Sequence, residues 1–164
     1  MSAVIRESAH GFRPARRADI ETIYRIECAA YDFPWSRRLL YDCLDSNYYF
    51  SLLIEQNRVV GYGIMSCVLD EAHLLNICID PAWQGKGRGK KMLFHLLDVA
   101  RRQRVTMAFL EVRLSNTVAQ NLYEANGFNQ IDIRKDYYPN GGQREDAIVY
   151  ARVLGHRNRP NPPA

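Results

Sequence analysis

At 164 residues and 19.0 kDa, the chain is long enough for one folded domain with a sizeable core. Its composition, 47% hydrophobic and 24% charged, is that of a soluble globular protein and excludes the disordered and collagen-like classes. No apolar run approaches the roughly 18 to 20 residues of a membrane span, and the first eleven residues lack a signal-peptide-like stretch. We therefore expect a cytoplasmic protein without membrane attachment.

The formal net charge of +4 is modest, and the basic residues fall into short runs scattered along the chain. Because no recognition helix or basic strand interleaved with aromatic residues stands out, a nucleic-acid-binding function is weakly supported. The residues most often used as metal or redox ligands are widely spaced: Cys28, Cys43, Cys67, Cys78, His10, His73, His95 and His156. We expect reduced, mostly buried thiols, no bound metal and no chemistry at any histidine.

Helices and strands are predicted from capping residues and from the periodicity of apolar residues. After an extended lead-in at Phe12–Ala15, helices are expected from an Asp19 cap to about Tyr31, from a Ser36 cap through Leu44, from Gly87 to about Arg104, and from a Ser115-Asn116 cap to Asn126-Gly127. Strands are expected at Tyr48–Ile54, Val59–Cys67, Glu71–Asp80, Thr106–Arg113, Phe128–Ile133 and Ala147–Val153.

Two turn signals and one apolar run indicate how these strands are arranged. The Gln56-Asn57 break and the Pro139–Gly142 turn each predict an antiparallel hairpin. The nearly continuous apolar run Leu74–Ile79 predicts a central strand that is covered on both faces. We expect a single domain over residues 12–154, a flexible N-terminus over 1–11 and a disordered tail, rich in proline and arginine, over 155–164.

A glycine-rich loop joins the expected central strand to the next helix. Its residues are Gln84, Gly85, Lys86, Gly87, Arg88, Gly89 and Lys90. Unpaired backbone N–H groups and the helix dipole attract phosphate at such a position. The loop lacks both the Walker A ending and the dinucleotide-binding glycine spacing, so ATP and NAD are disfavoured as ligands.

The pattern Gln84-x-x-Gly87-x-Gly89 after an apolar strand resembles the acetyl-CoA loop of the GCN5-related N-acetyltransferase (GNAT) family. The run from Glu111-Val112-Arg113-x-Ser115-Asn116 to Gly127-Phe128 resembles, more narrowly, the RimI branch, whose members acetylate the N-terminal alanine of a small-subunit ribosomal protein. Similar stretches at 33–36, 76–81, 134–139 and 144–147 extend the resemblance to about residues 12–153. It implies a mixed α/β (α+β) GNAT fold, with a central, mostly antiparallel mixed sheet, a parallel strand pair at the acetyl-CoA site and flanking helices.

The resemblance also implies how acetyl-CoA is held. Backbone groups of Ile77, Cys78 and Ile79 would hold the thioester, its developing oxyanion and the pantetheine arm. The loop from Gln84 to Lys90 would hold the pyrophosphate, and Asn116 would hold the pantetheine further along. Cys78 departs from the family pattern, where a smaller residue is expected, but the contact implied there is mainly to the backbone.

Acetyl transfer needs a base for the amine, an oxyanion site and a proton for the leaving thiolate. Glu111 stands in the otherwise apolar run Met107–Val112, and the resemblance makes it the general base and Tyr123 the proton donor. Because an ordinary glutamate is a weak base toward an amine, we expect Glu111 to have a pKa raised by burial or to act through a water. The alternatives are an ion pair with Arg113 for Glu111 and a core position for Tyr123.

The resemblance places Trp35, Tyr137 and Tyr138 in a peptide groove, although each is also a candidate for core packing. The expected acceptor is the N-terminal α-amine of a ribosomal protein that begins with alanine, since an α-amine is deprotonated more easily than a lysine. The alternatives are another protein or a small amine as acceptor, and a non-catalytic acetyl-CoA-binding module. We expect a monomer or weak dimer.

Overall fold

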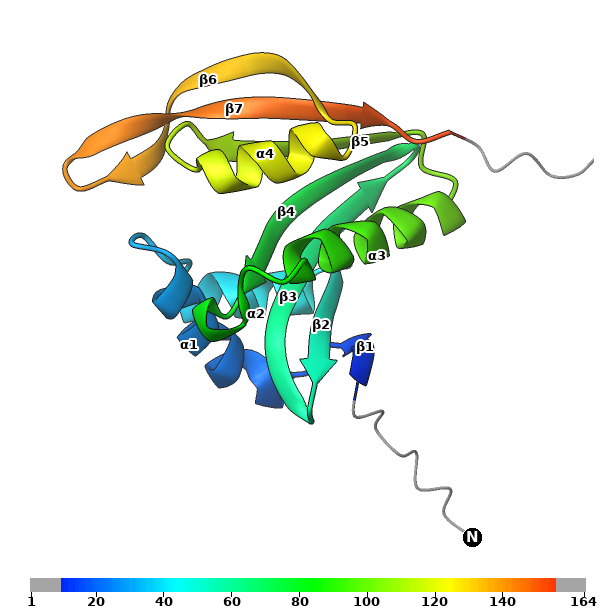
Figure 1. The fold of residues 1–164 in the computed structure, drawn as a ribbon, viewed down its shortest axis with the longest axis vertical. Coiled ribbons are helices and arrows are strands. Elements are labelled where there is room, and N and C mark those ends of the chain that lie inside the picture. Colours follow the sequence, from blue (N-terminus) through cyan, green and yellow to red (C-terminus); the bar gives the residue numbers. More distant parts are fainter. Residues whose placement is uncertain (1–9, 156–164) are drawn as a thin grey trace, which may run out of the picture. The chain divides into compact units, whose positions relative to one another are not determined.

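The structure is a computed structural model that describes residues 10–155, and these residues form two compact units (Figure 1). The first unit contains the chain up to Met65 and Leu75–Leu93, and the second contains Ser66–Leu74 and the chain from Phe94 onward. Nearly all of the tail expected over 155–164 and most of the N-terminus expected over 1–11 lie outside the described residues. Within the described part, no helix has the length and apolar character needed to cross a membrane.

The first unit is built from an antiparallel set of strands and two short helices. Its elements are β1 (His10–Pro14), η1 (Arg17–Asp19), α1 (Ile20–Ala30), α2 (Arg37–Asp45), β2 (Tyr49–Glu55), most of β3 (Arg58–Val68), the end of β4 (Glu71–Ile79), η2 (Pro81–Trp83) and the start of α3 (Arg88–Arg102). β1 pairs with β2 and β2 pairs with β3, both antiparallel. Gln56 and Asn57 have φ values of 50° and 59°, which confirms the predicted tight hairpin between β2 and β3.

The two early helices begin where they were predicted, but only one is capped as expected. The Ser36 hydroxyl oxygen accepts a hydrogen bond from the Leu39 N–H at 3.1 Å, which confirms it as the N-cap of α2. The predicted cap by the Asp19 side chain is wrong. Its carboxylate instead accepts from the Arg13 guanidinium at 2.8 and 2.9 Å and from the Arg16 N–H at 2.8 Å, because the helical backbone already starts in the turn η1, which contains Asp19.

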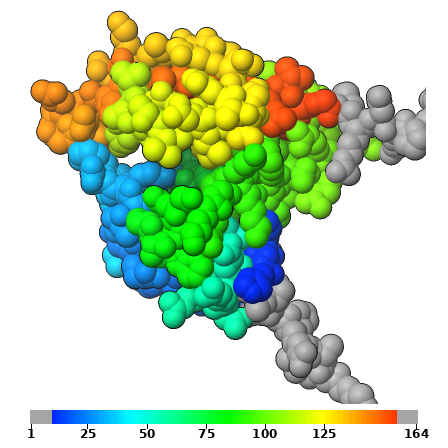
Figure 2. Space-filling view, in the orientation of Figure 1, coloured from blue at the N-terminus to red at the C-terminus, as the bar shows by residue number. Residues whose placement is uncertain are grey.

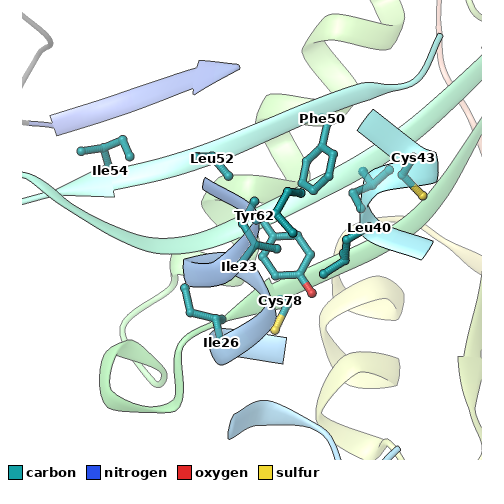
Figure 3. Packing of buried hydrophobic residues seen from close by; sticks show 11 residues of the cluster. Ile23, Ile26, Leu40, Cys43, Phe50, Leu52, Ile54, Tyr62 and Cys78 are labelled. Atoms are coloured by element: carbon teal, nitrogen blue, oxygen red, sulfur yellow. The ribbon is translucent and has the colours of Figure 1, made fainter. Parts of the chain in front are cut away.

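One hydrophobic cluster forms the core of the first unit (Figure 3). The buried face of α1 meets α2, β2, β3 and the end of β4 through Ile20, Ile23, Ile26, Leu40, Cys43, Phe50, Leu52, Ile54, Tyr62, Ile64 and Cys78. Apolar residues recur on α1 with helical spacing, and this periodicity turns one face of the helix toward the strands. Cys78 is 2% exposed, so the end of β4 is anchored in this core.

The second unit contains the rest of β4 with β5 (Met107–Arg113), α4 (Thr117–Ala125), β6 (Asn129–Asn140) and β7 (Gln143–Val153), in the strand order β4-β5-β7-β6. β4 and β5 are parallel, with Glu71 opposite Met107 and Leu74 opposite Leu110. The other two pairs are antiparallel. Antiparallel strands with one parallel pair and flanking helices confirm the predicted mixed α/β class.

The closing hairpin is longer than predicted. β6 and β7 run to the turn at Gly141 and Gly142, whereas the expected strands stopped at Ile133 and started at Ala147. Two irregularities interrupt the β6–β7 register, between Gln130 and Asp132 and between Arg134 and Tyr138. They break the alternation of apolar and polar residues from which strands are recognised.

The two faces of β5 are chemically different. Ala108, Leu110 and Val112 are buried, and Figure 1 shows α4 lying along the sheet of this unit. The ring of Tyr123 on α4 packs against Phe128 and Tyr150 with centroid distances of 5.7 and 6.3 Å. Phe109, Glu111 and Arg113 point to the opposite face, because successive side chains of a strand alternate.

Candidate active site

The predicted site residues fall in both compact units, and each group has its own geometry. In the first unit, the backbone N–H and C=O groups at the end of β4 alternate between two directions. The Asp80 N–H donates to the Val60 carbonyl of β3 at 2.8 Å. The Cys78 carbonyl oxygen also lies against β3, so close to Gly61 that a Cβ at position 61 would be only 2.7 Å from it, and only glycine fits there. Since backbone groups alternate along a strand, those of Ile77 and Ile79 point away from β3.

This alternation separates the three predicted backbone contacts. The carbonyl oxygens of Ile77 and Ile79 accept hydrogen bonds from the Tyr31 hydroxyl and the Gln84 side-chain amide, each at 2.9 Å. The N–H groups of Ile77 and Ile79 point in the same direction and are the candidate donors to a thioester oxygen. Cys78 directs its own backbone groups toward β3, which leaves Ile77 and Ile79 as the better placed candidates among the three.

The glycine-rich loop follows the 3-10 turn η2 and ends where α3 begins at Arg88. Gly85 and Gly87 have φ values of 85° and 76°, a region that L-residues rarely adopt, and no atom lies within 4 Å of a Cβ built at either position. The hydrogen-bond ladder of α3 starts with the Lys91 N–H donating to the Gly87 carbonyl at 3.0 Å. Figure 2 shows this segment, in green, on the surface of the first unit. Such a helix start attracts anions.

Arg88, one of the predicted phosphate-binding residues, uses its side chain to brace the loop. Its guanidinium donates to the Glu55 carboxylate at 2.8 and 3.0 Å and to the Trp83 carbonyl at 2.9 Å, and it lies 5.0 Å from the centre of the Trp83 ring. The contact holds the pKa of Glu55 below its usual range. Arg88 can therefore offer a ligand its backbone N–H more readily than its charge.

A buried carboxylate, which sequence reasoning missed, ties the first unit together. Glu27 on α1 is 1% exposed and accepts hydrogen bonds from the Tyr62 hydroxyl, from the Trp35 N–H at 2.9 Å and from the Asn76 amide at 3.2 Å. Buried charges persist where such donors satisfy them. Glu27 thus fixes Trp35, which packs half-buried against the core cluster, and links it to β4. The only sequence signal was a glutamate on the apolar side of a predicted helix.

Cys78 lies in the segment expected near the thioester. Burial, reinforced by the nearby charge of Glu27, raises the pKa of its thiol to about 12. The thiol therefore stays protonated at neutral pH and is a poor nucleophile. All four cysteines are free thiols, and two of them, Cys43 and Cys78, are buried.

In the second unit, Glu111 lies in a pocket of about 320 Å³ lined by Glu71, His73, Phe109, Glu111, Ile131, Asp132, Arg134 and Val149. Its Oε2 atom lies 2.6 Å from His73 Nε2, and its Oε1 atom lies 3.5 Å from Arg134 Nη1. The Glu111 side chain is 9% exposed. Burial raises the pKa of this carboxyl, but the hydrogen bond from His73 and the charges of His73 and Arg134 outweigh burial and leave it below its usual range.

These contacts change two of the sequence-based expectations. The suggestion that burial raises the pKa of Glu111 is wrong, because its two partners stabilise the ionised form. The ion pair considered for Glu111 exists, but with Arg134 and His73 rather than with Arg113. His73, to which the sequence assigned no chemistry, stands opposite Phe109, and Glu111 follows two residues later on the same face of β5. Only the strand register reveals this pair.

Tyr123 is 9% exposed, and burial raises the pKa of its phenol to about 12. The phenol is therefore protonated at neutral pH, as a proton donor must be. Its ring packs against Tyr150, which stands opposite Leu110, so Tyr123 and Glu111 belong to opposite faces of the β5–β7 pair. Tyr123 and Glu111 can therefore act in the same reaction only if they approach the reacting atoms from different sides.

The remaining candidates of the second unit have defined positions. The Asn116 side-chain oxygen accepts from the Ala119 N–H at 3.1 Å and caps α4, which leaves its NH2 group for a ligand. The rings of Tyr137 and Tyr138 meet edge to face at 4.8 Å, and the Arg113 guanidinium lies 4.5 Å from the Tyr138 ring. Burial and the neighbouring Tyr137 and Glu111 raise the pKa of Tyr138, so its hydroxyl also remains protonated. Across residues 10–155, no group of three or more His, Cys, Asp or Glu side chains is placed to hold a metal ion.

Comparison with known proteins identifies the class to which this fold and these residues belong. Residues 20–128 match the model of the acetyltransferase (GNAT) family, and the chain belongs to that family. It is 46% identical over 137 residues to the [ribosomal protein bS18]-alanine N-acetyltransferase of Haemophilus influenzae, a match that covers 83% of this chain and 93% of that protein.

Solved structures agree with this assignment. The crystal structure of the ribosomal-protein-S18-alanine N-acetyltransferase from Escherichia coli matches with a TM-score of 0.83 and 36% identity, over 92% of this chain and 98% of that one. A GNAT family acetyltransferase from Elizabethkingia anophelis with acetyl-CoA bound matches with a TM-score of 0.73 at 20% identity, over 90% and 100% of the two chains, which supports the fold.

Proposed function

We propose that this acetyltransferase transfers the acetyl group of acetyl-CoA to the N-terminal α-amine of a protein, and that the acceptor is a small-subunit ribosomal protein that begins with alanine. The observation that carries the reaction is the ionised Glu111 carboxylate, held between His73 and Arg134 at a pocket. The acceptor is inferred from the relatives in Haemophilus influenzae and Escherichia coli, which are named as alanine N-acetyltransferases.

The first unit supplies most of the groups proposed to hold acetyl-CoA. The glycine-rich loop and the start of α3 suit the pyrophosphate, because both present backbone N–H groups beside cationic residues. The N–H groups of Ile77 and Ile79, which point away from β3, suit the thioester oxygen and stabilise the negative charge that develops there. The amide of Asn116 remains the proposed contact for the pantetheine arm.

Glu111 is proposed to accept the proton that the acceptor nitrogen loses. An α-amine with a pKa near 7.7 to 8.0 becomes neutral at pH 7 for roughly 1 kcal/mol, against about 4.6 kcal/mol for a lysine, so the α-amine is the favoured acceptor. Because the pKa of Glu111 is lowered, it is a weak base toward a free ammonium. We therefore assign proton transfer to the moment after attack, when the nitrogen bears positive charge and is more acidic, and route it through a water. Tyr123 is proposed to protonate the leaving thiolate.

The setting proposed for this reaction is the cytoplasm, where ribosomal proteins and acetyl-CoA meet. The proposed partner is a protein N-terminus, without direct contact to nucleic acid or membrane, and the enzyme is proposed to act as a monomer or weak dimer. Trp35, Tyr137 and Tyr138 remain the proposed contacts for the acceptor peptide. Tyr137 is 40% exposed, which suits such a contact.

A peptide assay tests the proposed function. Recombinant protein is incubated with acetyl-CoA and a ribosomal peptide that begins with alanine, and the products are identified by mass spectrometry. We expect one added acetyl group on the α-amine, none on a peptide whose N-terminus is blocked, and a turnover reduced by roughly 10²-fold or more in Glu111→Gln. Acetylation of a lysine or of a small amine, with the alanine peptide untouched, would contradict the proposed acceptor. Full turnover by Glu111→Gln would remove the assigned role of Glu111.

A further inference from the structure

His73 is a half-exposed side chain to which the proposed reaction assigns no task. It comes from β4, and its Nε2 atom lies 2.6 Å from Oε2 of Glu111 on β5, the tightest contact that this carboxylate makes. The imidazole is 38% exposed, whereas the carboxylate is 9% exposed. The pair therefore joins a nearly buried candidate base to a side chain that water reaches.

The contact fixes which oxygen of Glu111 can serve the acceptor. An ionised carboxylate only accepts hydrogen bonds, so the Nε2–H of His73 must donate to Oε2, and a neutral imidazole then carries no proton on Nδ1. The other oxygen, Oε1, has the Arg134 guanidinium at the longer distance of 3.5 Å. Arg134 is half exposed, and its guanidinium also lies 5.5 Å from the centre of the Tyr137 ring. Oε1 is thus the less restrained oxygen.

We propose that His73 is a positioning residue for Glu111: its Nε2–H holds Oε2 and directs Oε1 to the acceptor amine or its water. This inference rests on the proposed function, because it assigns His73 to the same reaction.

Other charged and polar groups also surround the pair. The pocket also contains Glu71 from β4 and Asp132 and Arg134 from β6, and Tyr138 of β6 faces Glu111. β5 and β7 contribute Phe109 and Val149 there, which do not titrate. Among these groups, His73 makes the shortest contact with the Glu111 carboxylate.

Two substitutions of His73 distinguish a role in positioning Glu111 from a purely structural role. His73→Gln keeps an N–H donor at a similar reach, and His73→Ala removes it. With the alanine-first peptide, we expect His73→Ala to lower kcat about tenfold, while the KM for acetyl-CoA stays within about twofold. General acid–base groups accelerate reactions by roughly 10² to 10⁴, and a positioning residue should account for part of that factor. His73→Gln should stay within about threefold of the wild type. His10→Gln, an exposed histidine on β1, serves as the matched control and should leave both constants unchanged.

Rescue by the conservative variant and the split between kcat and KM are readouts that a structural role would not give. A purely structural role would not be rescued by the retained N–H donor of His73→Gln, and it would not lower kcat at an unchanged KM for acetyl-CoA. A His73→Gln variant as impaired as His73→Ala, or full kcat in His73→Ala, would overturn the inference.

Two controls keep these outcomes distinct. A wild-type protein that does not acetylate the alanine-first peptide would contradict the proposed function itself, whatever the variants do. Thermal unfolding shows whether His73→Ala folds. If it does not, His73→Gln decides: a kcat that falls about tenfold despite the retained N–H donor overturns the inference.

Discussion

Tyr123 has a phenol whose pKa burial raises to about 12, while an ordinary thiol has a pKa near 8.5. Full proton transfer from this phenol to the thiolate is uphill by roughly 5 kcal/mol, so a hydrogen bond to the sulfur contributes more than complete donation. We expect Tyr123→Phe to lower kcat by about tenfold or more and to change the KM for acetyl-CoA little, as steady-state kinetics would show. Tyr48→Phe, at an exposed tyrosine, is the control. A variant with normal kcat and a raised KM would mean that Tyr123 only shapes the binding site.

Glu27 leads to a prediction about stability rather than turnover. Replacing it by alanine leaves the Tyr62 hydroxyl, the Asn76 amide and the Trp35 N–H without their acceptor in a buried place. We expect Glu27→Ala to lower the free energy of unfolding by about 2 to 4 kcal/mol, measured by urea denaturation. Glu21→Ala on the same helix, where the glutamate is exposed and pairs with Arg37, should change it by less than about 1 kcal/mol. Similar losses in the two variants would show that the buried network adds little.

At the scale of elements, the glycine-rich loop can be tested against a second glycine with the same backbone conformation. Gly87 and Gly142 have φ values of 76° and 86°, and neither has an atom within 4 Å of a built Cβ. Substitution of either by alanine should therefore cost a similar 1 to 2 kcal/mol or so of conformational strain. Only Gly87→Ala should raise the KM for acetyl-CoA, by about fivefold or more, because only that loop is proposed to meet the pyrophosphate. Equal effects on this KM would argue against the assignment.

Elements were predictable where the signal is local. The helix starting near Gly87 and the hairpin at Gln56-Asn57 follow from periodicity and turn chemistry, and the structure has both. The full length of β6 was not predictable, since Arg134 to Tyr138 depart from the regular register and are mostly exposed. The glycine-rich loop and Glu111 could be named from the sequence. The contact of Glu111 with His73, 38 residues away, depends on the register of two parallel strands, which no local pattern records.

Across the whole molecule, ion pairs lower the pKa values of carboxyl groups in both units, and this sets the expected response to acid. Asp19 is held by Arg13, Glu55 by Arg88, and Glu111 by His73 and Arg134, each against the opposing effect of burial. A carboxyl group whose folded pKa is depressed stabilises the fold above its unfolded pKa, near 4, and this contribution is lost as the pH falls through the folded pKa. We expect Tm to be nearly constant from pH 7 to 5 and to fall steadily below about pH 4.5.

Arg13→Gln isolates one of these pairs. The variant lacks the charge that stabilises ionised Asp19, so its Tm should be lower than that of the wild type at pH 7, and the difference should shrink toward pH 3, as calorimetry would show. Arg58→Gln, which removes an exposed arginine on β3, is the control. A Tm difference that is independent of pH would mean that Arg13 stabilises the fold through packing and not through the charge of Asp19.

The irregular stretch of β6 has a consequence for how the closing hairpin tolerates changes in length. From Arg134 to Tyr138, four residue steps on β6 oppose two on β7, from Ala147 to Glu145. Because side chains alternate with a period of two, this excess of two residues keeps Arg134 and Tyr138 on the face that carries Glu111. Deleting two residues from the stretch would preserve that face, whereas deleting one would turn Tyr138 to the other side. Homologous hairpins should therefore differ in length here by even numbers of residues.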